Sequence, residues 1–81
     1  MITKIDRGHI TVQLGEKTAI VQGEMFFPSE GKIGFVVYRG TIDYWEPKVN
    51  LSKISEVEVE EIIQDISSDF QKGGHTLEVE P

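Results

Sequence analysis

The sequence predicts a small two-layer α+β domain in which a mainly antiparallel, twisted sheet carries one C-terminal amphipathic helix and a final strand, in the order β-β-β-β-α-β. Residues 10–45 alternate between apolar and polar side chains in short stretches separated by turn residues, which is typical of strands joined by hairpins. Residues 55–72 carry apolar side chains at helical spacing, and residues 76–80 alternate again. With 81 residues there is room for one domain, which we expect to span residues 1–81.

The first two strands form a predicted hairpin. Residues 10–14 alternate, Gly15-Glu16 supplies the turn, and residues 17–22 return. The second strand continues past Gly23, a predicted bulge or bend, into Met25-Phe26-Phe27. The residues at the N-terminus are a candidate for one further strand.

The next two predicted strands follow a loop over residues 28–32. Residues 33–38 are apolar on both faces, as in a central strand. After a turn at Arg39-Gly40, residues 41–45 form a short strand that ends before Pro47, because proline cannot donate to a sheet ladder.

The helix begins with several signals that agree. Ser55 with Glu58 three residues later forms a capping box, and Ile54 with Val59 occupies the two positions of a hydrophobic staple. Gly73-Gly74 supplies the left-handed stop at the other end. The apolar side chains fall within one narrow arc of the helix and predict a single buried stripe formed by Val59, Ile62, Ile63, Ile66 and Phe70.

One helix covers only one face of a sheet. Neighbouring apolar pairs such as Phe26-Phe27 and Val36-Val37 project to opposite faces, so some apolar surface must lie away from the helix. Either a strongly coiled sheet encloses that surface or a partner covers it. In the final strand we expect Leu77 and Val79 to point inward.

Composition excludes several classes of protein. The net charge is −6, and residues 56–81 hold eight acidic residues against the single cation Lys72. Clustered lysine and arginine are absent, which argues against direct binding of nucleic acid. Without cysteine there is no disulfide or thiolate metal site. No apolar stretch has the length of a signal peptide core or a membrane span, so we expect a cytoplasmic protein with no membrane partner.

Four acidic side chains lie together beside the apolar stripe of the helix: Glu58, Glu61, Asp65 and Asp69. The helix dipole accounts for Glu58 near the helix start but disfavours Asp65 and Asp69 in the second half. Like charges four residues apart also destabilise a helix. The face is either simply solvated or an acidic docking surface for a basic partner. A divalent-metal site is the weakest alternative, because no ligand-rich loop accompanies the carboxylates.

The segment Tyr44-Trp45-Glu46 holds the only tryptophan. Trp45 is either a core residue or an interface anchor, since tryptophan and tyrosine dominate binding hot spots. Tyr44 and Trp45 cannot both point inward from a regular strand. We therefore take Tyr44, Trp45 and Glu46, with the acidic helix face, as candidate partner-binding residues.

No pattern of residues marks a catalytic centre. His9 and His75 each follow glycine at a predicted turn edge, and no serine has the context of a nucleophile elbow. The loop around Gly31-Lys32 lacks the first glycine and the hydroxyl residue of a phosphate-binding loop. We expect no enzymatic activity, no catalytic residue, and no cofactor-binding or metal site.

Four short motifs, in this order, carry a resemblance to a known family: Ile2-Thr3-Lys4-Ile5, Phe35-Val36-Val37-Tyr38, Trp45-Glu46-Pro47 and Ile54-Ser55-Glu56. Together with the acid-rich helix and short last strand, they resemble the bacterial immunity proteins of polymorphic toxin systems labelled immunity protein 74. The chain departs from that pattern at Lys48, where the family continues with a second proline.

The resemblance implies a small cytoplasmic protein that binds and neutralises a cognate toxin domain without enzymatic activity. The expected mechanism is occlusion: the acidic helix face steers the protein to a basic toxin surface, and the aromatic segment supplies short-range affinity. The alternative is a structural or regulatory module without a toxin partner, which forms a homodimer through the second sheet face or a strand edge.

Overall fold

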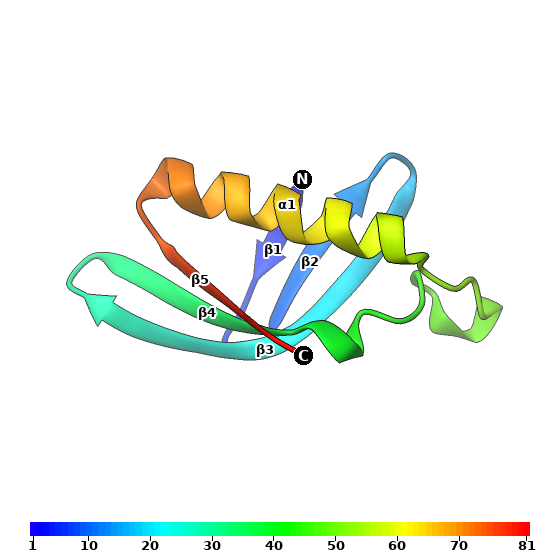
Figure 1. Cartoon of the computed structure of the whole chain (residues 1–81), viewed down its shortest axis with the longest axis horizontal. Coiled ribbons are helices and arrows are strands. Elements are labelled where there is room, and N and C mark those ends of the chain that lie inside the picture. The colour runs from blue at the N-terminus through cyan, green and yellow to red at the C-terminus, as the bar shows by residue number, and fades with distance from the viewer.

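The computed structural model describes residues 1–81 as a five-stranded sheet with one helix packed across it (Figure 1). The strands lie side by side in the order β1-β2-β3-β4-β5, and only the pairing of β4 with β5 is parallel. The predicted α+β class and the order β-β-β-β-α-β are therefore confirmed. The elements are β1 (Ile2–Ile5), β2 (His9–Leu14), β3 (Lys17–Ser29), β4 (Lys32–Tyr38), α1 (Glu56–Gly73) and β5 (Thr76–Glu80).

The fourth strand of this order is not the segment that we predicted. The N-terminal residues do form a strand, β1, but residues 41–45 do not. The chain instead leaves β4 through a 3-10 turn at Arg39–Thr41, and the segment after it makes only isolated bridges at Tyr44 and Glu46. The reason is that β5 occupies the free edge of β4, which a strand at 41–45 would have needed.

Strand β3 shapes the sheet because its two halves have different neighbours. The first half pairs with β2 as far as Gln22. The second half pairs with β4 from Gly23, where the sequence predicted a bulge or bend. The sheet consequently coils around one side of the helix, with β1 and β5 at its two edges (Figure 1).

The core lies between the helix and the inner face of the sheet. Four of the five residues of the predicted helical stripe are buried, and Ile63 is partly buried at its margin. The capping box is present, with the Glu58 N–H donating to the Ser55 hydroxyl over 3.2 Å and the Ser55 N–H donating to the Glu58 carboxylate over 3.0 Å. Gly74 has the left-handed conformation that ends the helix.

The apolar side chains of β3 and β5 are only partly covered. On β3, Phe26 is half-buried on the face away from the helix, so the coiled sheet encloses that face only in part, and Phe27 is exposed near the end of the strand. On β5, Leu77 packs against the core, and Val79 lies on the same face beside the buried Val37 but remains 42 % exposed. Val79 is exposed because β5 is an edge strand and no further strand lies beside it.

Candidate functional site

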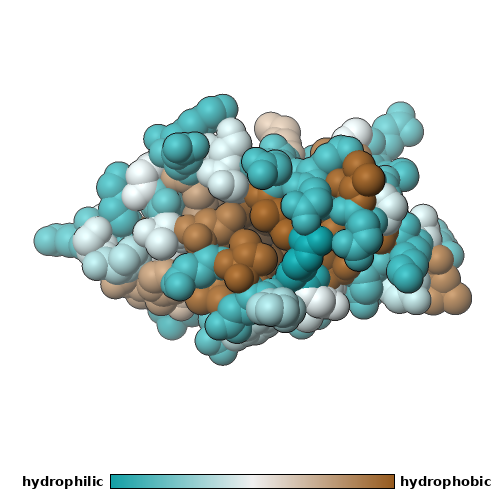
Figure 2. Space-filling model, in the orientation of Figure 1, coloured by the Kyte–Doolittle hydropathy of each residue, from teal (hydrophilic) through white to brown (hydrophobic).

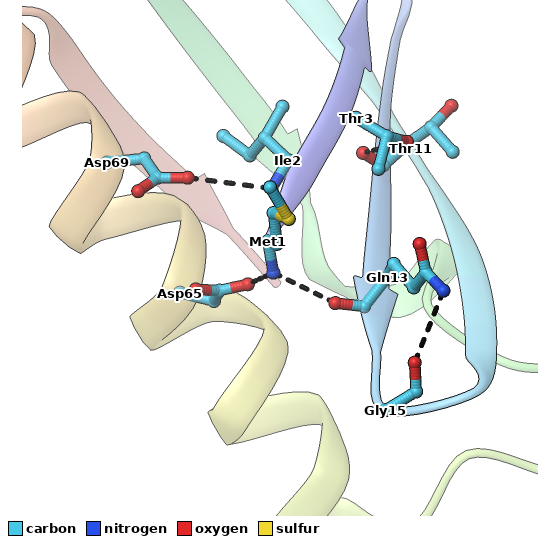
Figure 3. Close-up of polar contacts among 8 residues, drawn as sticks. All are labelled: Met1, Ile2, Thr3, Thr11, Gln13, Gly15, Asp65 and Asp69. Carbon is cyan, nitrogen blue, oxygen red and sulfur yellow. Dashed lines mark hydrogen bonds and ion pairs between the residues drawn. The ribbon is translucent and has the colours of Figure 1, made fainter.

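Two acidic side chains of α1, Asp65 and Asp69, point toward β1 and have partners there (Figure 3). The N-terminal ammonium of Met1 lies against the Asp65 carboxylate. The Ile2 N–H donates to Asp69 Oδ2 over 3.5 Å. These contacts fasten the second half of the helix to the edge strand. Asp65 and Asp69, which the helix dipole disfavours at this end of the helix, therefore hold the helix to the edge strand.

Glu58 is also engaged within the chain. Its carboxylate accepts the capping hydrogen bond from Ser55 and lies 3.2 Å from the Lys17 ammonium. The Ser55 N–H and the Lys17 ammonium together hold the pKa of Glu58 below its usual value. Of the four predicted acidic residues, only Glu61 has neither an ion pair nor a hydrogen bond, and it is exposed. Asp65 and Asp69 are therefore not simply solvated, because each contacts the N-terminal end of the sheet.

Trp45 belongs to the core, with only 3 % of its surface exposed. The Lys17 ammonium lies 5.3 Å from the centre of its ring, which is cation–π distance. Lys17 thereby joins the tryptophan to Glu58 at the start of the helix. Tyr44 and Glu46 are half-buried, and the Glu46 N–H donates to the Thr18 carbonyl over 2.8 Å. The three predicted anchor residues are adjacent, but the largest of them faces inward.

The loop after Trp45 exposes two apolar side chains that the sequence reading missed. Val49 is 86 % exposed and Leu51 is 71 % exposed. Leu51 has a φ of 51°, in the left-handed region that leucine seldom adopts. The signal in the sequence was the pair of apolar residues in Val49-Asn50-Leu51-Ser52, two residues after Pro47, where a regular strand is disfavoured. The loop is ordered by the Asn50 N–H donating to Pro47 and the Leu51 N–H donating to Lys48.

The opposite side of the helix, toward β5, is open. Hydrophobic side chains reach the surface between α1 and β5 in Figure 2. Ile63 lies on the flank of α1 opposite Asp65, and Leu77 and Val79 pair with the buried Phe35 and Val37, so these three incompletely covered side chains face this opening. We call this opening the α1–β5 groove. At one end, Arg39 spans it with its Nη2 atom 3.1 Å from Glu56 and 2.7 Å from Glu60.

A hollow of about 400 Å³ lies at that end of the groove. Its apolar lining residues are Ile42, Ile54 and Val59, and its polar ones include Asp43 and Lys53. A volume of this size admits one or two side chains of a partner or a small molecule. Its lining holds carboxylates and cations but no histidine or serine.

The two histidines have structural partners. His9 Nδ1 lies 3.2 Å from the Asp6 carboxylate, and the Gly8 N–H with this histidine holds the pKa of Asp6 below its usual value. His75 Nδ1 accepts from the Ile33 N–H over 3.1 Å and sets its ring edge-on to Phe70. No group of three histidine and acidic side chains is placed to hold a metal ion. The helix is also not long and apolar enough to cross a membrane.

Comparison with known families gives one match, and it covers almost the whole chain. The sequence model of the family described as Immunity protein 74 matches residues 2–80. No curated protein and no solved structure matches the chain. Because the family match extends from β1 to the end of β5, it includes the helix, both edges of the sheet and the α1–β5 groove. The chain belongs to the Immunity protein 74 family.

Proposed function

We propose that this protein is a bacterial immunity protein that binds a cognate toxin domain in the cytoplasm and neutralises it by occlusion, without catalysing a reaction. The observation that carries the proposal is the family match over residues 2–80. The lack of clustered lysine and arginine favours a protein partner over nucleic acid, and the net charge of −6 favours a partner with a basic surface.

Long-range attraction depends on the summed charge more than on any one pair. The helix face of Glu58, Glu61, Asp65 and Asp69 therefore contributes to steering even though three of the four have internal partners. Glu61 is the residue to test, because its charge can be reversed without breaking a contact within the fold. We expect Glu61→Lys to slow association with the toxin at low salt and to have little effect at high salt.

Co-expression tests the proposal directly. The probe is the C-terminal domain of the toxin gene that adjoins the gene of this protein, expressed with and without it. We expect the domain alone to arrest growth, and the pair to grow and to co-purify as a complex. Continued growth arrest, the lack of an adjoining toxin gene, or a stable homodimer that ignores the domain would contradict the proposal and favour a self-associating module.

A further inference from the structure

The two long sides of α1 differ in a way that suggests where a partner binds. On the β1 side, Asp65 and Asp69 close the gap between the helix and the sheet through Met1 and Ile2 (Figure 3). On the β5 side there is no equivalent set of polar contacts along the strand, and apolar side chains reach the surface (Figure 2). A partner on the β1 side would have to displace contacts that the fold already makes. A partner in the α1–β5 groove would displace water from apolar surface, which is favourable.

Strand β5 offers that partner a backbone as well as side chains. It is the last strand of the sheet, paired with β4 on one side and with no strand on the other. An unpaired edge presents a row of N–H and C=O groups that an added strand can satisfy. Recognition by strand addition uses this edge for affinity and alternate side chains for specificity.

The side chains of β5 alternate in a way that specifies such a strand. Leu77 and Val79 lie on the helix side, and Glu78 and Glu80 lie on the other face of the sheet. Neither glutamate has an ion pair. Burial raises the pKa of the neighbouring Tyr38, and the charges of Glu24 and Glu80 raise it further.

Three cations from β3, β4 and the turn after β4 do not offset that charge, because each of them contacts α1 instead. Lys17 pairs with Glu58, Lys32 donates to the Gly73 carbonyl over 2.9 Å, and Arg39 binds the acidic residues at the helix start. These three cations therefore contact the helix, and no ion pair neutralises Glu78 or Glu80 on the outer face of β5. Glutamates on an edge strand also discourage pairing with an identical edge, because like charges would lie across from one another.

We propose that β5 and the α1–β5 groove are the docking site for an extended segment of the toxin domain that adds to the sheet as a sixth strand. This inference rests on the proposed function and deepens it. The segment carries apolar side chains on the face that covers Ile63 and Val79. It carries lysine or arginine on the other face, opposite Glu78 and Glu80. A second copy of this chain lacks that pattern at its own β5 edge and is not the expected occupant.

Substitution at Val79 tests the apolar half of the site. Val79→Lys places a charge in the groove, and Val57→Lys is the matched control, since Val57 is exposed on the solvent side of α1, outside the groove. The probe is the purified toxin domain from the adjoining gene. We expect Val79→Lys to raise the Kd by about 30-fold or more, as for a hot-spot residue, and Val57→Lys to change it by less than about threefold. Equal effects of the two variants would overturn the proposal.

Charge removal tests the acidic half. The pair Glu78→Gln and Glu80→Gln is compared with Glu16→Gln and Glu30→Gln, which remove two unpaired glutamates from hairpin turns and change the net charge equally. We expect the β5 pair to slow association by about tenfold at low salt, and the control pair to change it by less than about twofold. Similar slowing by both pairs would show a general charge effect and would overturn the assigned site.

Hydrogen exchange of the wild-type complex tests strand addition without any substitution. We expect new protection of amides in residues 76–80 when the toxin domain binds, with little change on the solvent side of α1. Protection elsewhere with none in β5, or self-association through β5 in the absence of toxin, would overturn the proposal. If the wild-type protein does not bind the toxin domain at all, the proposed function is wrong. If it binds the toxin domain and none of the groove substitutions changes the affinity, only the assigned site is wrong.

Discussion

Gly23 lies where β3 leaves β2 and joins β4, and a single methyl group at this position should be costly. A Cβ there would lie 1.9 Å from the Val36 carbonyl oxygen and 2.5 Å from the Phe35 ring. The strands would have to separate by about 1 Å to relieve the contact with the backbone oxygen. Overpacking costs about 1–3 kcal/mol and each disrupted hydrogen bond about 1 kcal/mol, so we expect Gly23→Ala to lower the free energy of unfolding by about 3–5 kcal/mol.

Gly34→Ala is the matched control. A Cβ at Gly34 would also be crowded, at 2.3–2.7 Å from three ring atoms of Phe26. That ring is half-buried on the face away from the helix and can turn aside, so we expect a change within about 1 kcal/mol. Urea unfolding followed by the fluorescence of Trp45, the single buried tryptophan, measures both variants. Equal unfolding midpoints for the two would refute the reasoning that the backbone contact at Gly23 cannot relax.

Three further predictions concern local features. Ser55→Ala should lower the free energy of unfolding by about 1 kcal/mol through loss of the cap, whereas Ser55→Asp should retain it; thermal unfolding distinguishes the two. Leu51→Asn should raise the melting temperature, because asparagine tolerates the left-handed φ of 51° better than leucine, and a lower melting temperature would contradict this. Burial opposes ionisation of Asp43, but the Lys48 ammonium and the Tyr44 N–H outweigh it and hold the pKa of Asp43 below its usual 3.8. The resulting stability is present above pH 3.8 and is lost as the pH falls through the lower folded value, so unfolding of Asp43→Asn should depend less on pH below 4.

The helix was predictable almost end to end because its signals are local. Ser55 and Glu58 form the cap within one turn, and the apolar stripe follows directly from the spacing of its side chains. The strand expected at residues 41–45 failed for a nonlocal reason. The edge of β4 that it required is taken by β5, which lies about 35 residues further along the chain. Alternation of side chains predicts that a segment can be a strand, but not which segment will obtain a neighbour.

The candidate site shows the same limit. A helical wheel placed Asp65 and Asp69 on one flank but could not show what that flank faces. The groups that meet the helix acids come from far away in sequence, with Ile2 67 residues from Asp69 and Lys17 41 residues from Glu58. For the same reason the wheel did not show that the flank beside Ile63 stays open.

Because one flank is closed by polar contacts and the other exposes apolar surface, substitutions on the two sides should have different consequences. Lys17→Met removes the ion pair with Glu58 and the cation–π contact with Trp45, so we expect it to lower stability while leaving toxin affinity unchanged. Val79→Lys should do the reverse, since its side chain is 42 % exposed at the edge of the sheet. Measuring unfolding and binding on both variants separates the residues that hold the helix from those that meet a partner. If Lys17→Met binds the toxin domain more weakly under conditions in which the variant is fully folded, the docking surface lies on the β1 side instead.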